Sequence, residues 1–249
     1  MVRRWILVGL LALAAGCDSG GDAAPEPAPP PAADPLSQVR AAAAKTAGVP
    51  AHVTLSAPNV EVAGDTDPPG KALTLTATTS GDGETTESKV RVVGDDAWMT
   101  LGKTYLPKLD PTKFIKFSTS EFATASLVHL GDPFDPAGLK GFSAAMTSAT
   151  RTGDAYTGNL DLAEAPAGVS RGLLPATAEQ LQGNGGSSQS VPYEVSVDAQ
   201  GYLTSLKVTV PTYASTAEFT ALGRPVKIAK PSASEVIEVP DGVRRILAG

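Results

Sequence analysis

Apolar and polar residues alternate along much of this chain, which is the pattern of β-strands that bury one face. The alternation is clearest over residues 191–210, where a turn at residues 198–201 separates two alternating halves and predicts a hairpin. Residues 64–70 are rich in Gly, Asp and Pro and predict a turn. Further strands are expected at residues 52–57, 71–78, 114–117, 156–162, 213–222 and 225–229, with three short ones inside 89–107.

Helical spacing predicts a smaller number of helices. Asp34 can cap the first amides of a helix that starts at Pro35, and Gly48 with Pro50 ends it. Apolar residues at helical spacing predict two more helices over residues 121–130 and 136–149, and a small one over 177–182. Strands and helices do not alternate as βαβ units. The order predicts an α+β fold, a curved antiparallel sheet with helices against one face.

The N-terminus has the features of an export signal. Arg3 and Arg4 precede an apolar run over residues 5–15, which is too short to span a bilayer. The chain's single cysteine, Cys17, follows, and residues 13–17 (LAAGC) resemble the lipobox at which a bacterial lipoprotein is cleaved and diacylated. We expect residues 1–16 to be a signal peptide and Cys17 to hold the protein on the extracytoplasmic face of the cell membrane. The alternative is an ordinary secreted protein with a stray cysteine.

Composition separates a tether from a domain. Residues 18–33 carry no large apolar side chain and are rich in Pro and Ala, so residues 17–33 are expected to be the acylated cysteine and a disordered spacer. The remaining residues, 34–249, have a length typical of one domain.

The chain without its signal peptide is acidic. Removing Arg3 and Arg4 leaves 18 of the 20 basic residues against 26 acidic ones, a net charge of −8. This balance argues against nucleic acid as a partner and against docking on an anionic membrane through a basic patch.

Catalytic and metal-binding motifs are not found in the sequence. There is no Gly-x-Ser-x-Gly, and His52 and His129 lie in no motif, so both are interpreted as structural. Asp95-Asp96 and Asp132 with Asp135 are interpreted as turn residues, and residues 183–186 as a flexible loop. A distant pair of catalytic carboxylates stays open. We expect no enzyme activity, no cofactor and no metal.

Four segments resemble a known family. Residues 197–203 (VDAQGYL) resemble the conserved hairpin of the actinobacterial LppX/LprAFG lipoproteins, which have a LolA-like fold, and residues 219–231 resemble their closing segment. Residues 92–106, and Asp132-Pro133 with residues 136–139, resemble two further family segments. The resemblance implies a half-barrel sheet with helices packed in its concave face around an apolar pocket. It also implies binding of lipid or lipoglycan acyl chains for carriage or presentation in the envelope, with a membrane transporter as a possible partner.

Apolar residues of the strands and the central helices are candidates for lining such a pocket. If the strand set and the helix set face each other, the space between them is either an acyl-chain pocket or plain hydrophobic core. A filled core would instead favour an envelope sensor or scaffold that binds a membrane-protein partner. The candidates are Leu73, Leu75, Val90 and Val92 on strands, and Leu127, Leu130, Leu139, Phe142 and Met146 on helices.

Overall fold

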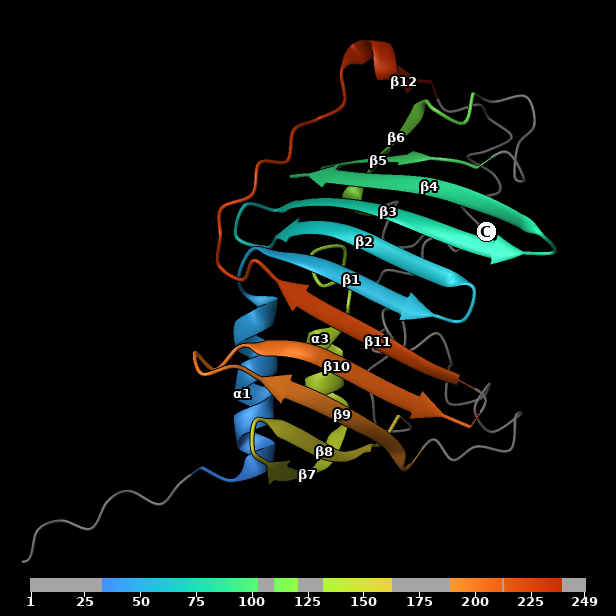
Figure 1. The fold of residues 1–249 in the computed structure, drawn as a ribbon. Coiled ribbons are helices and arrows are strands. Elements are labelled where there is room, and N and C mark those ends of the chain that lie inside the picture. Colours follow the sequence, from blue (N-terminus) through green and yellow to red (C-terminus); the bar gives the residue numbers. More distant parts are fainter. Residues whose placement is uncertain (1–32, 103–109, 121–131, 163–188, 212, 239–249) are drawn as a thin grey trace, which may run out of the picture. The chain divides into compact units, whose positions relative to one another are not determined.

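The computed structural model describes residues 33–102, 110–120, 132–162, 189–211 and 213–238, and residues 33–249 belong to one compact unit. The described strands form one twelve-stranded sheet in the order β12-β6-β5-β4-β3-β2-β1-β11-β10-β9-β8-β7. The sheet is open and curved, and its strands run across Figure 1 from β12 to β7. The strands are β1 (Ala51–Ala57), β2 (Val60–Asp67), β3 (Ala72–Gly81), β4 (Glu84–Val93), β5 (Asp96–Thr100), β6 (Phe114–Ser118), β7 (Met146–Thr152), β8 (Ala155–Leu160), β9 (Val191–Val197), β10 (Leu203–Val210), β11 (Tyr213–Thr220) and β12 (Val236–Ile237).

All neighbouring strands pair antiparallel except the short β12, which pairs parallel with β6. The described helices are α1 (Pro35–Ala47), α3 (Leu139–Ala145) and the 3-10 turn η1 (Ala233–Glu235). Helices α1 and α3 contact each other, and α1 contacts β7, β9 and β10. Both helices lie behind the β8–β11 half of the sheet in Figure 1. The predicted α+β fold, a curved sheet with helices against one face, is confirmed.

Helix α1 begins and ends as its sequence predicts. The Asp34 carboxylate accepts the Ser37 backbone N–H at 3.1 Å, Pro35 occupies the first turn, and Gly48 caps the end. Near that end the buried Thr46 hydroxyl accepts the Leu203 N–H at 2.8 Å and lies 3.3 Å from the Leu203 carbonyl oxygen. These contacts satisfy backbone groups at the start of β10, so they fix α1 to the sheet.

The predicted hairpin over residues 191–210 is confirmed as β9 and β10. The Asp198 carboxylate accepts the N–H of Gln200 at 3.0 Å and of Tyr202 at 2.8 Å, which closes the turn, and Gly201 has φ 80°. The strands expected at 52–57, 71–78, 114–117, 156–162 and 213–222 are also present. Of the three short strands expected within 89–107, the first two belong to β4 and β5. The third, and the helices expected at 121–130 and 177–182, lie outside the described residues.

Three local predictions are wrong. Residues 64–67 belong to strand β2, not to a turn; β2 pairs along its whole length with β1 and β3, and this pairing outweighs its Gly and Asp content. Residues 225–229 are not a strand but part of a connection to η1, where Pro225 offers no N–H to a ladder. The helix expected over 136–149 covers only Leu139–Ala145, and Met146 opens β7 because the chain there pairs with β8.

The buried apolar side chains form two clusters on the same face of the sheet. Register shows that the face is shared: Val53 is opposite Gly64, and Gly64 is opposite Leu75. The first, called here the helix-covered cluster, joins α1 and α3 to β1 and β8–β11. The second, called here the β3–β6 cluster, consists of Leu73, Leu75, Val90, Val92, Ala97, Met99, Leu101, Ile115 and Phe117.

Candidate functional site

The four strand candidates lie together in the β3–β6 cluster. Leu73 is directly opposite Val92, and Leu75 is directly opposite Val90, so the four make a continuous apolar patch across β3 and β4. None is more than 6% exposed. Among the described residues, the partly buried apolar side chains packed against this cluster come from Val62, Phe134 and Ile237. No member of the cluster is more than 9% exposed, and since Val62 and Ile237 belong to the sheet itself, Phe134 is the described side chain that packs on the cluster from outside the sheet.

The described helix candidates lie in the other cluster. Leu139, Phe142 and Met146 pack in the helix-covered cluster, where the Phe142 ring meets the Tyr193 ring edge-on with centroids 5.2 Å apart. The structure thus places them apart from Leu73, Leu75, Val90 and Val92 rather than in one facing set. Leu127 and Leu130 lie outside the described residues. Whether any of these residues lines a pocket stays a prediction.

A segment over residues 132–138 connects the two clusters. Phe134 packs on the β3–β6 cluster, whereas Ala137 and Leu139 are buried in the helix-covered cluster. The cavity that these residues share with α1, β1 and β2 measures only about 10 Å³, roughly the room of one water molecule. The helix-covered cluster is therefore closely packed where it meets this segment.

Asp135 is the buried carboxyl group of this segment, with 5% exposure. Its two oxygens accept the backbone N–H groups of Leu139 at 2.8 Å and Lys140 at 2.9 Å, at the first turn of α3. Desolvation outweighs these hydrogen bonds and the nearby Lys140, so burial raises the pKa of Asp135 above its ordinary value of 3.8. The neighbouring Asp132 forms an ion pair with Lys140 at 2.7 Å.

Asp135 gives a pH-dependent prediction. A raised pKa means that the folded state binds this proton more tightly than the unfolded state. Its contribution to stability is therefore full below pH 3.8 and is lost as the pH rises through the folded pKa. We expect the free energy of unfolding of Asp135→Asn minus that of wild type to increase as the pH is raised from acid to neutral, because only the wild type loses this contribution. Urea unfolding of both proteins across this range measures the difference; a relative stability that falls with pH contradicts it.

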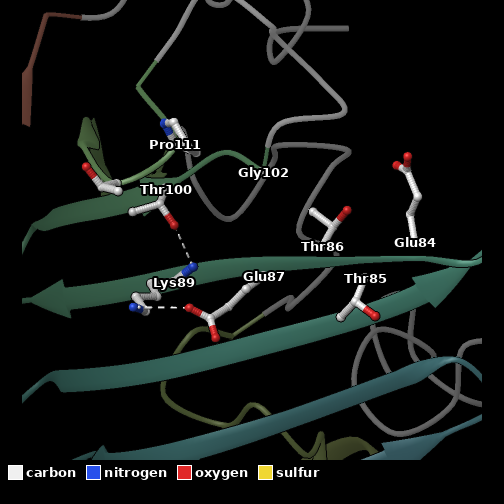
Figure 2. A pocket seen from close by; sticks show the side chains of 9 residues that line it. Glu84, Thr85, Thr86, Glu87, Lys89, Thr100, Gly102 and Pro111 are labelled. Atoms are coloured by element: carbon white, nitrogen blue, oxygen red, sulfur yellow. Dashed lines mark hydrogen bonds and ion pairs between the residues drawn. The ribbon is translucent and has the colours of Figure 1, made fainter.

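A larger hollow lies beside the outer half of β4 (Figure 2). Its volume is about 530 Å³. The Lys89 backbone N–H donates to the Thr100 hydroxyl at 2.8 Å, and the Lys89 ammonium lies 3.1 Å from the Glu87 carboxylate. Most of the residues that line the hollow are Thr, Glu or Lys, so its lining differs in chemistry from the apolar β3–β6 cluster. It is lined by Glu84, Thr85, Thr86, Glu87, Lys89, Thr100, Gly102, Pro111 and Thr112.

The remaining polar groups have structural contacts. His52 lies 2.8 Å from the Asp65 carboxylate on neighbouring strands, with both side chains about two-fifths exposed. Burial raises the pKa of Tyr193 to about 12, and its neutral hydroxyl donates to the Ser148 carbonyl oxygen at 2.8 Å. In the part of the chain that the structure describes, no three His, Cys, Asp or Glu side chains gather to hold a metal ion. His129 lies outside that part.

Helices within the described ranges include none that is both long and apolar enough to cross a bilayer. Cys17 and the residues around it lie outside these ranges. The signal peptide and the acylated cysteine therefore rest on the sequence alone.

Sequence reasoning missed Phe134 and Thr66 as residues of the candidate site. Phe134 stands between Pro133 and Asp135 in what is read as a turn, so its contact with a distant cluster leaves no periodic signal. Thr66 lies in the Gly- and Asp-rich stretch that was expected to be a turn, yet it is buried and its hydroxyl lies 3.5 Å from the Phe134 carbonyl oxygen. The one local indication that Phe134 is buried was that a large apolar residue stands between two residues typical of turns.

Comparison with known proteins identifies the fold. No family model matches the chain, and no curated protein matches it. Among solved structures, LprF from Mycobacterium bovis aligns with a TM-score of 0.52 and 15% identity over 80% of this chain and 97% of LprF. The Mycobacterium tuberculosis lipoprotein LppX aligns with a TM-score of 0.46 and 16% identity over 78% and 97%. The likeness to LprF confirms, at the level of the fold, the resemblance that the sequence segments carry.

Proposed function

We propose that this protein is a lipid-anchored envelope lipoprotein that binds the acyl chain of a lipid or lipoglycan against the β3–β6 cluster. The observation that carries the proposal is the division of the apolar face into two clusters. Helices α1 and α3 pack into the helix-covered cluster, while the β3–β6 cluster contains no residue of a described helix. The fold shared with LprF supports the same assignment.

The chemistry of the β3–β6 cluster suits a hydrocarbon tail. Its members are aliphatic side chains, Met99 and Phe117, with no charged group among them. Each methylene of an acyl chain costs about 0.8 kcal/mol to expose to water. A chain that leaves a membrane therefore needs an apolar surface of this kind, and burial alone supplies the affinity without a catalytic group. A domain that carries or presents such a chain requires only binding and release.

Native mass spectrometry of residues 33–249, expressed without the anchor, tests the proposal. Extra mass that organic extraction removes, identified as an acyl lipid, is the expected result. A bare mass together with no uptake of a fluorescent fatty acid would contradict it. That outcome would favour the second interpretation of the sequence, an envelope sensor or scaffold whose filled core serves a surface that binds a membrane protein.

The membrane anchor is proposed to be a diacylated Cys17, because the lone cysteine follows the apolar run of residues 5–15 at the lipobox position. Two acyl chains anchor a protein stably, whereas one gives marginal binding. We expect Cys17→Ser to move the protein from the membrane fraction to the soluble fraction, and Ser19→Ala to leave it in the membrane. Fractionation with mass spectrometry of the N-terminal peptide measures both. A Cys17→Ser protein that stays membrane-bound although residues 1–16 have been removed, or a wild-type N-terminal peptide without acyl mass, contradicts the anchor.

A further inference from the structure

Phe134 borders the candidate acyl site at one defined end. Its ring packs on the β3–β6 cluster, and its carbonyl oxygen lies 3.5 Å from the Thr66 hydroxyl. Thr66 is directly opposite Leu73, and Leu73 is directly opposite Val92. Phe134 therefore lies at the end of the apolar patch that Leu73 and Val92 form, on the side toward the helix-covered cluster.

The backbone that carries Phe134 is held on both sides. The Phe134 N–H donates to the Asp132 carboxylate at 2.9 Å, and the same carboxylate pairs with Lys140 at 2.7 Å. Asp135 accepts two N–H groups of α3, as described above, and Gly138 has a left-handed φ of 68° that lets the chain turn directly into that helix. These contacts hold the segment in place, so the Phe134 ring lies at a defined position at the end of the apolar patch.

The space beyond Phe134 cannot receive a hydrocarbon chain. The cavity on its far side, between residues 134–139 and Val53, Thr66 and Phe219, measures about 10 Å³. A methylene chain that reached Phe134 would meet this closely packed region and could not continue into the helix-covered cluster. A tail that lies along the β3–β6 cluster in place of its present cover would therefore end at Phe134.

We propose that Phe134 is a specificity-determining residue that sets the maximum length of the acyl chain. This inference rests on the proposed function, since it assigns a role to one residue of the same site. Each methylene group that is buried against apolar side chains raises the affinity for the fatty acid about fourfold, which is the equivalent of about 0.8 kcal/mol. Affinity should rise with chain length until the tail reaches the Phe134 ring and then level off. Removing the ring should move that limit to longer chains.

The test measures binding of saturated fatty acids of increasing length to residues 33–249, by displacement of a fluorescent fatty acid. For wild type, affinity is expected to rise and then reach a plateau. For Phe134→Ala the plateau should begin several carbons later, and for Phe134→Leu it should lie between the two. Leu36→Ala, which truncates a partly buried residue of the helix-covered cluster, is the control and should leave the profile unchanged.

The outcomes separate this inference from the proposed function. If wild type binds fatty acids and Phe134→Ala has the same plateau, the role of Phe134 is overturned while the acyl site stands. If no fatty acid binds wild type or either Phe134 variant, the proposed function itself fails. A uniform loss of affinity in Phe134→Ala without a change of plateau also overturns the inference, because it is what a purely structural residue would give.

Discussion

Gly64→Ala is expected to destabilise the fold by at least about 3 kcal/mol, because the position has no room for a methyl group. A Cβ at Gly64 would lie 1.9 Å from the Thr74 carbonyl oxygen, 2.8 Å from its carbonyl carbon and 2.9 Å from the Leu75 Cα. All three atoms belong to the backbone of β3, and β2 is paired on its other side with β1. Neither strand can move away without breaking a ladder. Urea unfolding followed by circular dichroism measures the loss.

Gly81→Ala is the matched control for this substitution. Gly81 also lies in a strand of the sheet, at the end of β3, but a Cβ there has nothing within 4 Å. Its free energy of unfolding should change by less than about 1 kcal/mol, since the alanine mainly reduces the freedom of the unfolded chain. Equal stability of Gly64→Ala and wild type would show that β2 is not held between β1 and β3 as the register states.

Val92→Phe is expected to lower the affinity for a long fatty acid at least about tenfold, and because Val92 is fully buried it should also cost about 1–3 kcal/mol of stability. Val92 lies in the middle of the β3–β6 cluster, opposite Leu73. If that cluster receives an acyl chain, the larger ring occupies space that the chain would otherwise fill. Binding is lost, and the larger side chain at a buried position lowers stability as well. Displacement of a fluorescent fatty acid and urea unfolding measure the two quantities on the same protein.

Val208→Phe makes the same change in the helix-covered cluster. Val208 is 1% exposed on β10, among residues packed under α1 and α3. Overpacking a filled core costs about 1–3 kcal/mol, so this variant should be destabilised and should keep its affinity for fatty acid. If neither wild type nor either variant binds a fatty acid, or if the two variants bind it equally well, the β3–β6 cluster is ordinary core. The sensor or scaffold function is then the better interpretation.

The pair of glycine substitutions and the pair of valine substitutions test two different properties of the sheet. The glycine pair tests the pairing of β1, β2 and β3, the strands that join the two halves of the apolar face. The valine pair tests whether the β3–β6 cluster binds an acyl chain while the helix-covered cluster does not. Together the two pairs distinguish a protein with this fold and a filled core from one in which the β3–β6 cluster binds a ligand.

Local signals in the sequence were sufficient for the elements that depend on their own residues. Helix α1 is set by Asp34, Pro35 and Gly48, whose side chains or backbone freedom satisfy the groups at its ends. The β9–β10 hairpin is set by alternation and by the Asp198 turn, both readable within twenty or so residues. The N-terminal signal and Cys17 are likewise local, and they remain predictions from the sequence.

Only the tertiary structure decided what depends on distant residues. Residues 64–67 of strand β2 have the composition of a turn, and they are extended because β1 and β3 supply hydrogen bonds on both sides. Met146 is spaced like a helical residue, and it starts a strand because β8 pairs with it. Leu75 and Phe142 look alike as buried apolar residues, and they fall into separate clusters because β1 pairs with the distant β11 and so places the two halves of the sheet in order. Hydrophobic periodicity predicts that a residue is buried, but only the order of the strands decides which residues it is buried against. In this protein the strand order therefore decides which apolar residues lie together in the candidate site.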